Sequence, residues 1–211
     1  MANKRVYQLK RRAERQVETR RRITAATVAL HEEVGPARTT ISAIAARAGV
    51  ERLTVYRHFP EERDLLGACQ EHFLRAHPLP EIGAWVAIDD PRRRLRTALT
   101  ALYTRYRETE AMTAHILRDA PSLPALAELI EGMPRYFSVA TDVLSEGWNI
   151  GDEQRPLLRA LLGHALDFET WRSLARRQGL EDREAVKVMV RLIWCVAEHG
   201  PGGDENKPAV D

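Results

Sequence analysis

Basic, hydroxyl and aromatic side chains gather within seven residues, from Arg52 to His58. If this stretch is a helix, Val55 and Phe59 face inward. Six side chains then remain largely outside: Arg52, Leu53, Thr54, Tyr56, Arg57 and His58. A soluble helix gains no stability from displaying this mixture, whereas guanidinium groups, hydroxyls and an imidazole suit phosphate oxygens and base edges. The chemistry that these residues indicate is DNA recognition.

A shorter apolar helix and a glycine turn precede this stretch. Four apolar residues recur at helical spacing and predict one buried face: Ile41, Ile44, Ala45 and Ala48. Thr40 is a suitable N-cap, because its hydroxyl can accept a hydrogen bond from a free N–H group of the first turn. Gly49 can adopt the left-handed conformation that ends a helix. Two short helices joined by such a turn predict a helix-turn-helix over residues 39–59.

Residues 39–59 read TTISAIAARAGVERLTVYRHF, and they resemble the DNA-binding segment of the TetR family of transcriptional regulators. The resemblance extends over residues 20–75. It implies that Thr40, Tyr56 and His58 contact DNA phosphates. The variable, outward positions of the second helix hold Arg52, Leu53 and Arg57, which we predict to read bases, since arginine pairs with guanine and leucine can meet a thymine methyl group.

The chain departs from the family's pattern at two positions. Leu53 stands where Gly or Pro is frequent, and Glu62 stands where a lysine often begins the next helix. The second departure leaves the neighbouring Arg63 as the basic residue that can make the phosphate contact of that helix.

The formal charge is unevenly distributed. Residues 1–60 hold 13 Lys and Arg against 5 Asp and Glu, a net charge of +8, so the other 151 residues carry −6 within a whole-chain charge of +2. A basic head on an acidic body docks on nucleic acid in one orientation. Residues 1–17 form a basic N-terminal arm that either stays solvated or contacts phosphates or the minor groove, and part of it could extend the first helix backwards. Residues 20–22 either stay solvated or reach the backbone of a duplex.

The apolar periodicity and the resemblance together predict an all-α fold of about nine helices. We expect a helix-turn-helix domain with its connecting helix over residues 18–76, whose first helix runs from about Glu18 to Val34. A larger helical domain for effector binding and dimerisation would cover residues 77–199, followed by a disordered tail over residues 200–211. Within the larger domain, Pro134 is expected to kink a helix that runs from about residue 126 to 144.

The last two predicted helices, at about residues 153–177 and 182–198, are apolar nearly all round. A helix of this kind must be buried on more than one side. One side meets the protein's own core, and the other is most simply covered by a second copy, so we expect a homodimer through residues 153–198. A charge at Val190 or Ile193 is then predicted to dissociate the dimer.

Resemblance to the family also implies a small-molecule pocket in the larger domain. The residues that could line it are aromatic or polar-tipped: Tyr103, Tyr106, Met133, Phe137, His164, Phe168 and Trp171. From their types and spacing alone, most of these side chains are better explained as core packing. The effector itself is unknown from the sequence.

The sequence contains no catalytic constellation, phosphate loop, metal-ligand spacing or membrane-spanning run, so an enzyme, a cofactor and a membrane partner are not expected. Cys69 and Cys195 match no disulfide framework, which favours the cytoplasm. The predicted function is that of a homodimeric repressor, released from a palindromic double-stranded operator by a small ligand. The alternatives are an activator with the same head and a non-specific, architectural DNA-coating protein.

Overall fold

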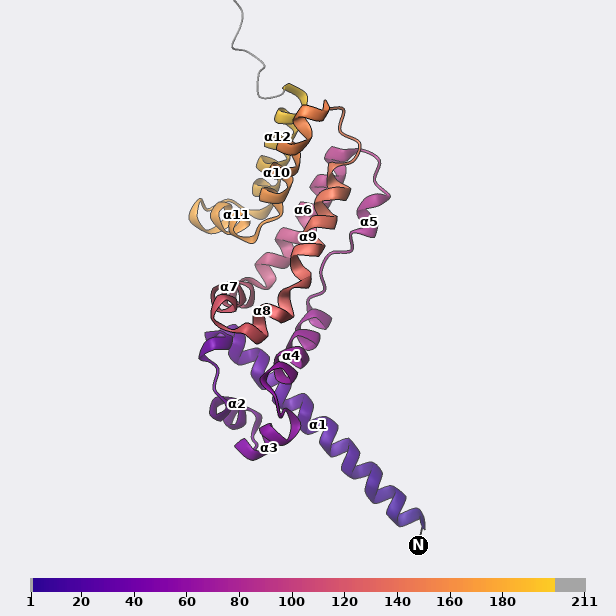
Figure 1. Cartoon of the computed structure of the whole chain (residues 1–211), viewed down its shortest axis with the longest axis vertical. Helices are drawn as coiled ribbons and strands as arrows, with labels where there is room; N and C mark the ends of the chain where they lie inside the picture. Colours follow the sequence, from indigo (N-terminus) through magenta and orange to yellow (C-terminus); the bar gives the residue numbers. More distant parts are fainter. Residues whose placement is uncertain (1, 200–211) are drawn as a thin grey trace, which may run out of the picture. The chain divides into compact units, whose positions relative to one another are not determined.

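The computed structural model describes residues 2–199, and within them every regular element is helical (Figure 1). The chain packs as two compact units. The first consists of the residues up to Pro78 together with Thr109–Glu131, and the second of Leu79–Glu108 together with the residues from Gly132 onward. The all-α expectation is confirmed.

The first unit contains the predicted helix-turn-helix. It consists of α1 (Ala2–Val34), a 3-10 turn η1 (Pro36–Arg38), α2 (Ile41–Ala48), α3 (Arg52–His58) and α4 (Glu62–Ala76). The Thr40 hydroxyl accepts a hydrogen bond of 3.1 Å from the N–H of Ala43, which caps α2 as predicted. Gly49 ends α2 with φ 63° and ψ 44°, the left-handed conformation that glycine adopts without steric cost.

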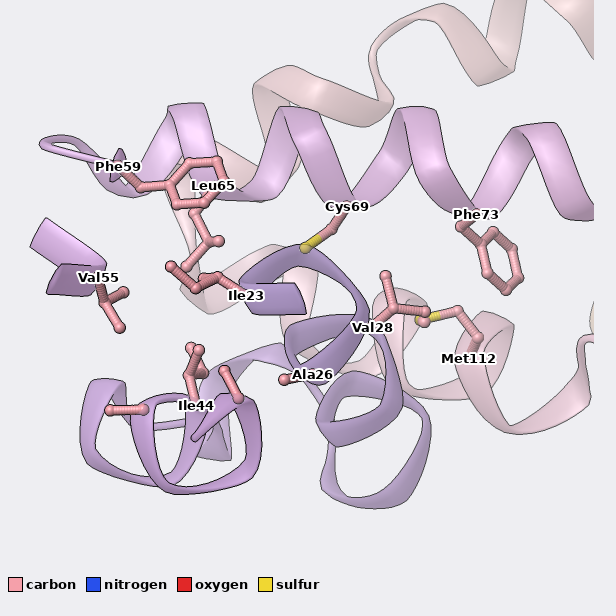
Figure 2. Close-up of a cluster of buried hydrophobic side chains, with 12 residues drawn as sticks. Ile23, Ala26, Val28, Ile44, Val55, Phe59, Leu65, Cys69, Phe73 and Met112 are labelled. Carbon is pink, nitrogen blue, oxygen red and sulfur yellow. The ribbon is translucent and has the colours of Figure 1, made fainter. Parts of the chain in front are cut away.

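One hydrophobic core holds these helices together (Figure 2). It is built from apolar side chains that α1, α2, α3 and α4 direct inward: Ile23, Ala26, Val28, Ile44, Ala45, Ala48, Val55, Leu65, Cys69 and Phe73, with Phe59 from the end of α3. Burial raises the pKa of the Cys69 thiol to about 12, so Cys69 is a neutral packing residue. Met112 completes this core from α7 (Glu110–Asp119), far along the sequence.

The packing divides the chain differently from the expected boundary after residue 76. Besides α7, the first unit includes a 3-10 turn η2 (Ala120–Ser122) and α8 (Pro124–Ile130). Leu66 of α4 packs with Ala120 and Leu126 in a second small core cluster. The segment Thr109–Glu131 therefore belongs to the DNA-binding unit, because its apolar faces are covered by α1 and α4.

The first helix is longer than its predicted extent. Instead of beginning near Glu18, α1 begins at Ala2 and continues through the residues expected to form an arm. Side chains from Lys10 to Glu18 are exposed, whereas the buried part of the helix begins at Ile23. The helix therefore has a solvent-exposed N-terminal extension and a C-terminal part anchored in the core.

The second unit comprises α5 (Gly83–Val86), α6 (Pro91–Glu108), α9 (Gly132–Ser145), the 3-10 turn η3 (Asp152–Gln154), α10 (Arg155–Leu166), α11 (Phe168–Arg172), a π-helical turn (Ser173–Arg177) and α12 (Asp182–His199). Fully buried leucines of α6, α9 and α10 form its core: Leu95, Leu99, Leu102, Leu144, Leu158 and Leu162. Arg94 is also buried, and its guanidinium donates to the carbonyls of Ile88, Val143 and Glu146.

Two helices expected beyond residue 120 are each divided in the structure. The predicted helix over residues 153–177 breaks at Asp167, whose carboxylate accepts from the N–H of Glu169 at 2.7 Å and so caps the separate helix α11. The predicted helix over residues 126–144 breaks at Glu131 instead of kinking at Pro134. Pro134 lies in the first turn of α9, where its missing N–H costs nothing because the first helical N–H groups have no intrahelical acceptor.

No helix between residues 2 and 199 combines the length and the apolar character needed to cross a membrane.

Candidate nucleic-acid interface

The outward face of α3 carries the residues predicted to meet DNA. Leu53 is 65% exposed and Tyr56 is 45% exposed, and Arg52 and Arg57 are exposed as well. Thr54 and His58 are half-buried beside them. The inward position Val55 is fully buried. The structure thus brings the predicted base-reading and phosphate-contacting residues of α3 onto one accessible helix.

Two arginines of α1 hold the ends of the helix-turn-helix. Arg20 donates from Nη1 to the carbonyl oxygen of His58 at 2.5 Å, and its guanidinium carbon lies 4.0 Å from the centroid of the Phe59 ring. Arg22 donates from Nη2 to the carbonyl of Ala48 and, at 3.2 Å, to that of Gly49. Because helix C-termini leave carbonyls without intrahelical partners, a cation is well placed at both positions.

Sequence reasoning missed this role, because a run of three arginines looks like a solvated or phosphate-binding patch. Only Arg21 behaves as a surface residue, since it pairs with Glu18 on the same helix at 2.7 Å. The sequence does not indicate that Arg20 would reach the end of α3 and Arg22 the end of α2. That information depends on how α1 packs against α2 and α3.

His58 lies in an electrostatically positive environment. Partial burial is the largest cause that lowers its pKa, and the neighbouring positive charges of Arg20 and Arg57 lower it further. His58 is therefore neutral at neutral pH and can offer one ring N–H as a hydrogen-bond donor. A neutral donor can hold a phosphate without carrying sequence information.

The other predicted DNA-facing residues lie at the starts of helices. Thr40 is exposed, and although its oxygen caps α2, its hydroxyl hydrogen is not used by that bond. Glu62 and Arg63 are exposed in the first turn of α4. Arg63 lies 3.8 Å from Glu128 of α8, an ion pair between well-exposed side chains that contributes little stability.

The residues proposed for an effector pocket all lie in the second unit, and four of them form one aromatic cluster. Tyr103, Tyr106, Phe168 and Trp171 are buried. The ring centroids of Tyr106 and Phe168 lie 5.3 Å apart, and those of Phe168 and Trp171 lie 5.6 Å apart. Their arrangement is that of a packed core.

The hydroxyl and indole N–H groups of this cluster already form hydrogen bonds within the chain. The hydroxyl of Tyr103 donates to the carbonyl of Ala165 at 2.9 Å, and that of Tyr106 donates to Leu166 at 2.6 Å. The indole N–H of Trp171 donates to Asp182 at 2.9 Å. These bonds tie α6 to the end of α10, and α11 to the start of α12.

The remaining candidates are more accessible. Met133 and Phe137 are half-buried on α9, where Phe137 meets the ring of Tyr136 edge-on. His164 is exposed near the end of α10, and its Nδ1 lies 3.1 Å from the Thr170 hydroxyl.

The outward faces of α10 and α12 carry exposed apolar side chains. Leu157 is 37% exposed, Val188 39% and Leu192 53%. Val190 and Ile193, by contrast, are 2% and 0% exposed within the single chain. Both side chains therefore belong to the protein's own core, and the expectation that a charge there would probe a dimer contact is corrected.

Comparison with known proteins agrees with this geometry. Residues 23–69 match the family model described as bacterial regulatory proteins, tetR family. No curated protein matches the chain. Among solved structures, a TetR-like transcriptional regulator from Rhodococcus sp. RHA1 is 21% identical with a TM-score of 0.62, covering 84% of this chain and 94% of its own.

A TetR transcription regulator from Haloarcula marismortui is 17% identical with a TM-score of 0.56, covering 86% of this chain and 97% of its own. At such identities the likeness shows the fold, whereas the match over residues 23–69 concerns the helix-turn-helix itself. Residues 23–69 therefore match the DNA-binding segment of the tetR family, and the chain has the helical fold of solved TetR-like regulators.

Proposed function

We propose that this protein is a homodimeric, sequence-specific repressor that a small ligand releases from a palindromic operator. The observation that carries the proposal is the outward face of α3. It presents Arg52, Leu53 and Arg57 to solvent while Arg20 holds the end of the same helix. A recognition helix must be accessible and rigidly held to read bases in the major groove.

In this proposal the DNA-facing side chains of the helix-turn-helix have two kinds of role. Arg52 and Arg57 read guanine edges, and Leu53 meets a thymine methyl group. The phosphate contacts come from neutral donors: Thr40, Thr54, Tyr56 and His58. Such contacts fix the register of the helix on the duplex and are indifferent to sequence.

The exposed extension of α1 supplies further phosphate contacts. Its basic side chains Lys10, Arg11, Arg12 and Arg15 are all exposed. They lie on the same continuous helix as Arg20 and Arg22, which bind the helix-turn-helix. An unbroken helix therefore connects these charges to the head, and each phosphate that they neutralise would steepen the salt dependence of binding.

A second copy would cover the apolar outward faces of α10 and α12. Leu157, Val188 and Leu192 support this assignment, because large apolar side chains exposed on two helices that pack together favour association. Two copies related by a two-fold axis would present two recognition helices. Their half-sites would lie about 34–36 Å apart, one turn of DNA.

Release requires that the ligand prefer the conformation in which the two heads do not fit the operator. A coupling of about 1–3 kcal/mol would weaken operator binding about 5- to 150-fold. The half-buried residues Met133 and Phe137 of α9, and the exposed His164, are the candidate pocket residues that remain most accessible.

The experiment is selection of bound duplexes from a random pool by the purified full-length protein. The proposal predicts enrichment of a palindrome whose half-sites are one helical turn apart. A non-specific architectural protein would enrich no sequence and would show a steep salt dependence on every duplex. Activation by the same head would give the same palindrome, and a transcription assay on that operator separates it from repression.

A further inference from the structure

The connector between α1 and α2 decides where the helix-turn-helix begins. Gly35 follows α1 with φ 93° and ψ 159°, and Pro36 opens the turn η1. The Thr39 hydroxyl donates back to the carbonyl of Gly35 at 2.9 Å. Because α2 starts at Ile41, directly after this connector, any change in the connector moves the start of α2 relative to α1.

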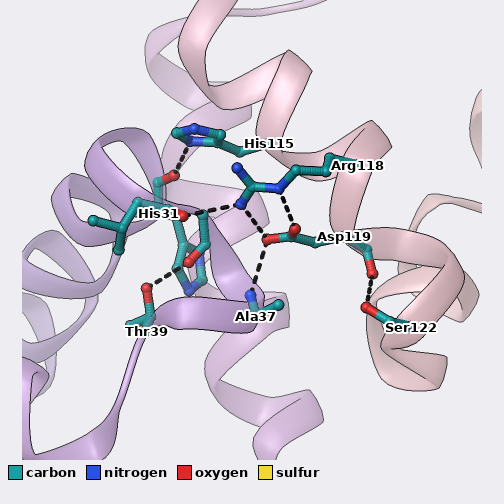
Figure 3. A network of polar contacts seen from close by, with 9 residues as sticks. His31, Ala37, Thr39, His115, Arg118, Asp119 and Ser122 are labelled. Atoms are coloured by element: carbon teal, nitrogen blue, oxygen red, sulfur yellow. Dashed lines mark hydrogen bonds and ion pairs between the residues drawn. The ribbon is translucent and has the colours of Figure 1, made fainter.

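Two side chains at the end of α7 hold this connector (Figure 3). Arg118 donates from Nη2 to the carbonyl of Val34, the last residue of α1, at 2.9 Å. Asp119 accepts from the backbone N–H of Ala37 at 3.0 Å. Arg118 and Asp119 also bind each other, through Nε at 2.6 Å and Nη2 at 3.0 Å. A donor and an acceptor of α7 thus bracket the connector on both sides of Gly35.

The carboxylate of this pair is buried. Asp119 is only 4% exposed, and the hydrogen bond from Arg118, joined by that from Ala37, lowers its pKa despite the burial. A buried carboxylate is tolerated because both partners bind its charged form. The pair is therefore set up to hold the connector with an ionised group, and loss of either member leaves the other without its main partner.

Gly35 has no room for a side chain beside the pair. A Cβ atom there would overlap Nη2 of Arg118 and would lie 2.5 Å from Oδ2 of Asp119. Its positive φ is also a conformation that other residues rarely adopt. The glycine lets Arg118 and Asp119 approach the backbone closely enough to bond on either side of it.

We propose that Arg118 and Asp119 are positioning residues for operator binding. They hold the α1–α2 connector in the one conformation that presents α3 in the register of the operator. The assignment rests on the proposed function, because it concerns binding of a specific sequence. Both residues lie in Thr109–Glu131, so the helix-turn-helix is held by a segment from the middle of the chain that packs in the same unit.

The test compares Arg118→Ala, Arg118→Lys and Asp119→Asn in the full-length protein. Arg75→Ala is the matched control, because Arg75 belongs to the same unit and forms an exposed pair with Glu71 at 2.6 Å. Dissociation constants are measured for the selected operator and for a scrambled duplex, at a temperature where circular dichroism shows each variant fully folded.

We expect Arg118→Ala and Asp119→Asn to weaken operator binding by about tenfold or more, the size of a lost charge-assisted hydrogen bond. Binding to the scrambled duplex should stay within about twofold of the wild type, since it depends mainly on exposed charge. Arg118→Lys keeps the positive charge but lacks the planar guanidinium group that bonds two acceptors at once, so its loss of operator affinity should be smaller. This variant preserves the test if Arg118→Ala does not fold. Arg75→Ala should match the wild type on the operator.

The assignment would be overturned if the folded variants bind the operator with the wild-type dissociation constant, even if their melting temperatures fall. Equal losses on both duplexes would also overturn it, since positioning acts on the specific complex. If the wild type itself prefers no sequence, it is the proposed function that fails, and this assignment fails with it.

Discussion

Arg52 and Arg57 are the residues on which sequence choice is expected to depend. Replacing either with alanine should remove discrimination at one base pair, a loss of about 1–3 kcal/mol between the preferred and the other bases. The measurement is repeated selection from the random pool with each variant. Tyr56→Phe is the control, because loss of a phosphate donor weakens every duplex alike. An unchanged preferred sequence in both arginine variants would contradict their role as base readers.

His31 makes the stability of the free protein depend on pH. It is 6% exposed, and burial lowers its pKa from 6.5 to about 4. The unfolded chain therefore takes up the proton first, and stability falls as the pH drops from 6.5 towards 4, by about 3 kcal/mol at the limit. Well above pH 6.5 both states are neutral at this site, and it then contributes no pH dependence.

Thermal melts between pH 7 and pH 4 measure this effect. His31→Gln should flatten the decline, although His58, whose pKa is also lowered, leaves a smaller slope of the same sign. Protonation of Asp119 lowers stability only at more acidic pH, because its pKa lies below the ordinary value of 3.8. Equal slopes for the wild type and His31→Gln would show that His31 is not the group that titrates.

At the scale of elements, α1 supports the helix-turn-helix through Arg22. Arg22→Ala removes the donor from the carbonyls at the end of α2 and should lower the free energy of unfolding by about 1–2 kcal/mol, as expected for a lost charge-assisted hydrogen bond that is partly exposed. Urea denaturation provides the measurement. Arg21→Ala is the matched control, since Arg21 pairs only on the surface of α1 with Glu18. Equal losses in the two variants would contradict the support role.

The elements themselves were predictable where local chemistry decides them. Apolar spacing predicted α2 and α3, and the cap at Thr40 and the left-handed turn at Gly49 follow from the residue types. The break at Asp167 was not predicted, because an apolar run continues on both sides of it and only the capping bonds reveal the new helix.

Which helices pack against each other could not be predicted from periodicity. An apolar stripe states that a helix face is buried but not which element covers it. The stripe of α7 gave no sign that Met112 would enter the core of the first unit, or that Arg118 and Asp119 would reach the α1–α2 connector. The same limit applies to Val190 and Ile193, which were predicted to lie in a dimer contact but are buried within their own chain.

At the scale of the molecule, the proposed dimer depends on the outward face of α12. Leu192 is 53% exposed in the single chain, whereas its neighbour Ile193 is fully buried. Leu192→Glu should give a folded monomer, because a charge on the contact face opposes association without entering the core. Ile193→Glu should instead unfold the second unit, since it buries an unpaired charge.

Sedimentation velocity and circular dichroism together distinguish these outcomes. A Leu192→Glu variant that sediments like the wild type would contradict the assignment of this face to a second copy.

The affinity ratio between two duplexes tests the central claim most directly. The dissociation constants of the wild-type protein are measured on the selected palindrome and on a scrambled duplex of the same length, at physiological salt. A protein that reads DNA sequence through α3 should bind the palindrome about a thousandfold or more tightly than the scrambled duplex. Equal dissociation constants for the two duplexes would contradict it.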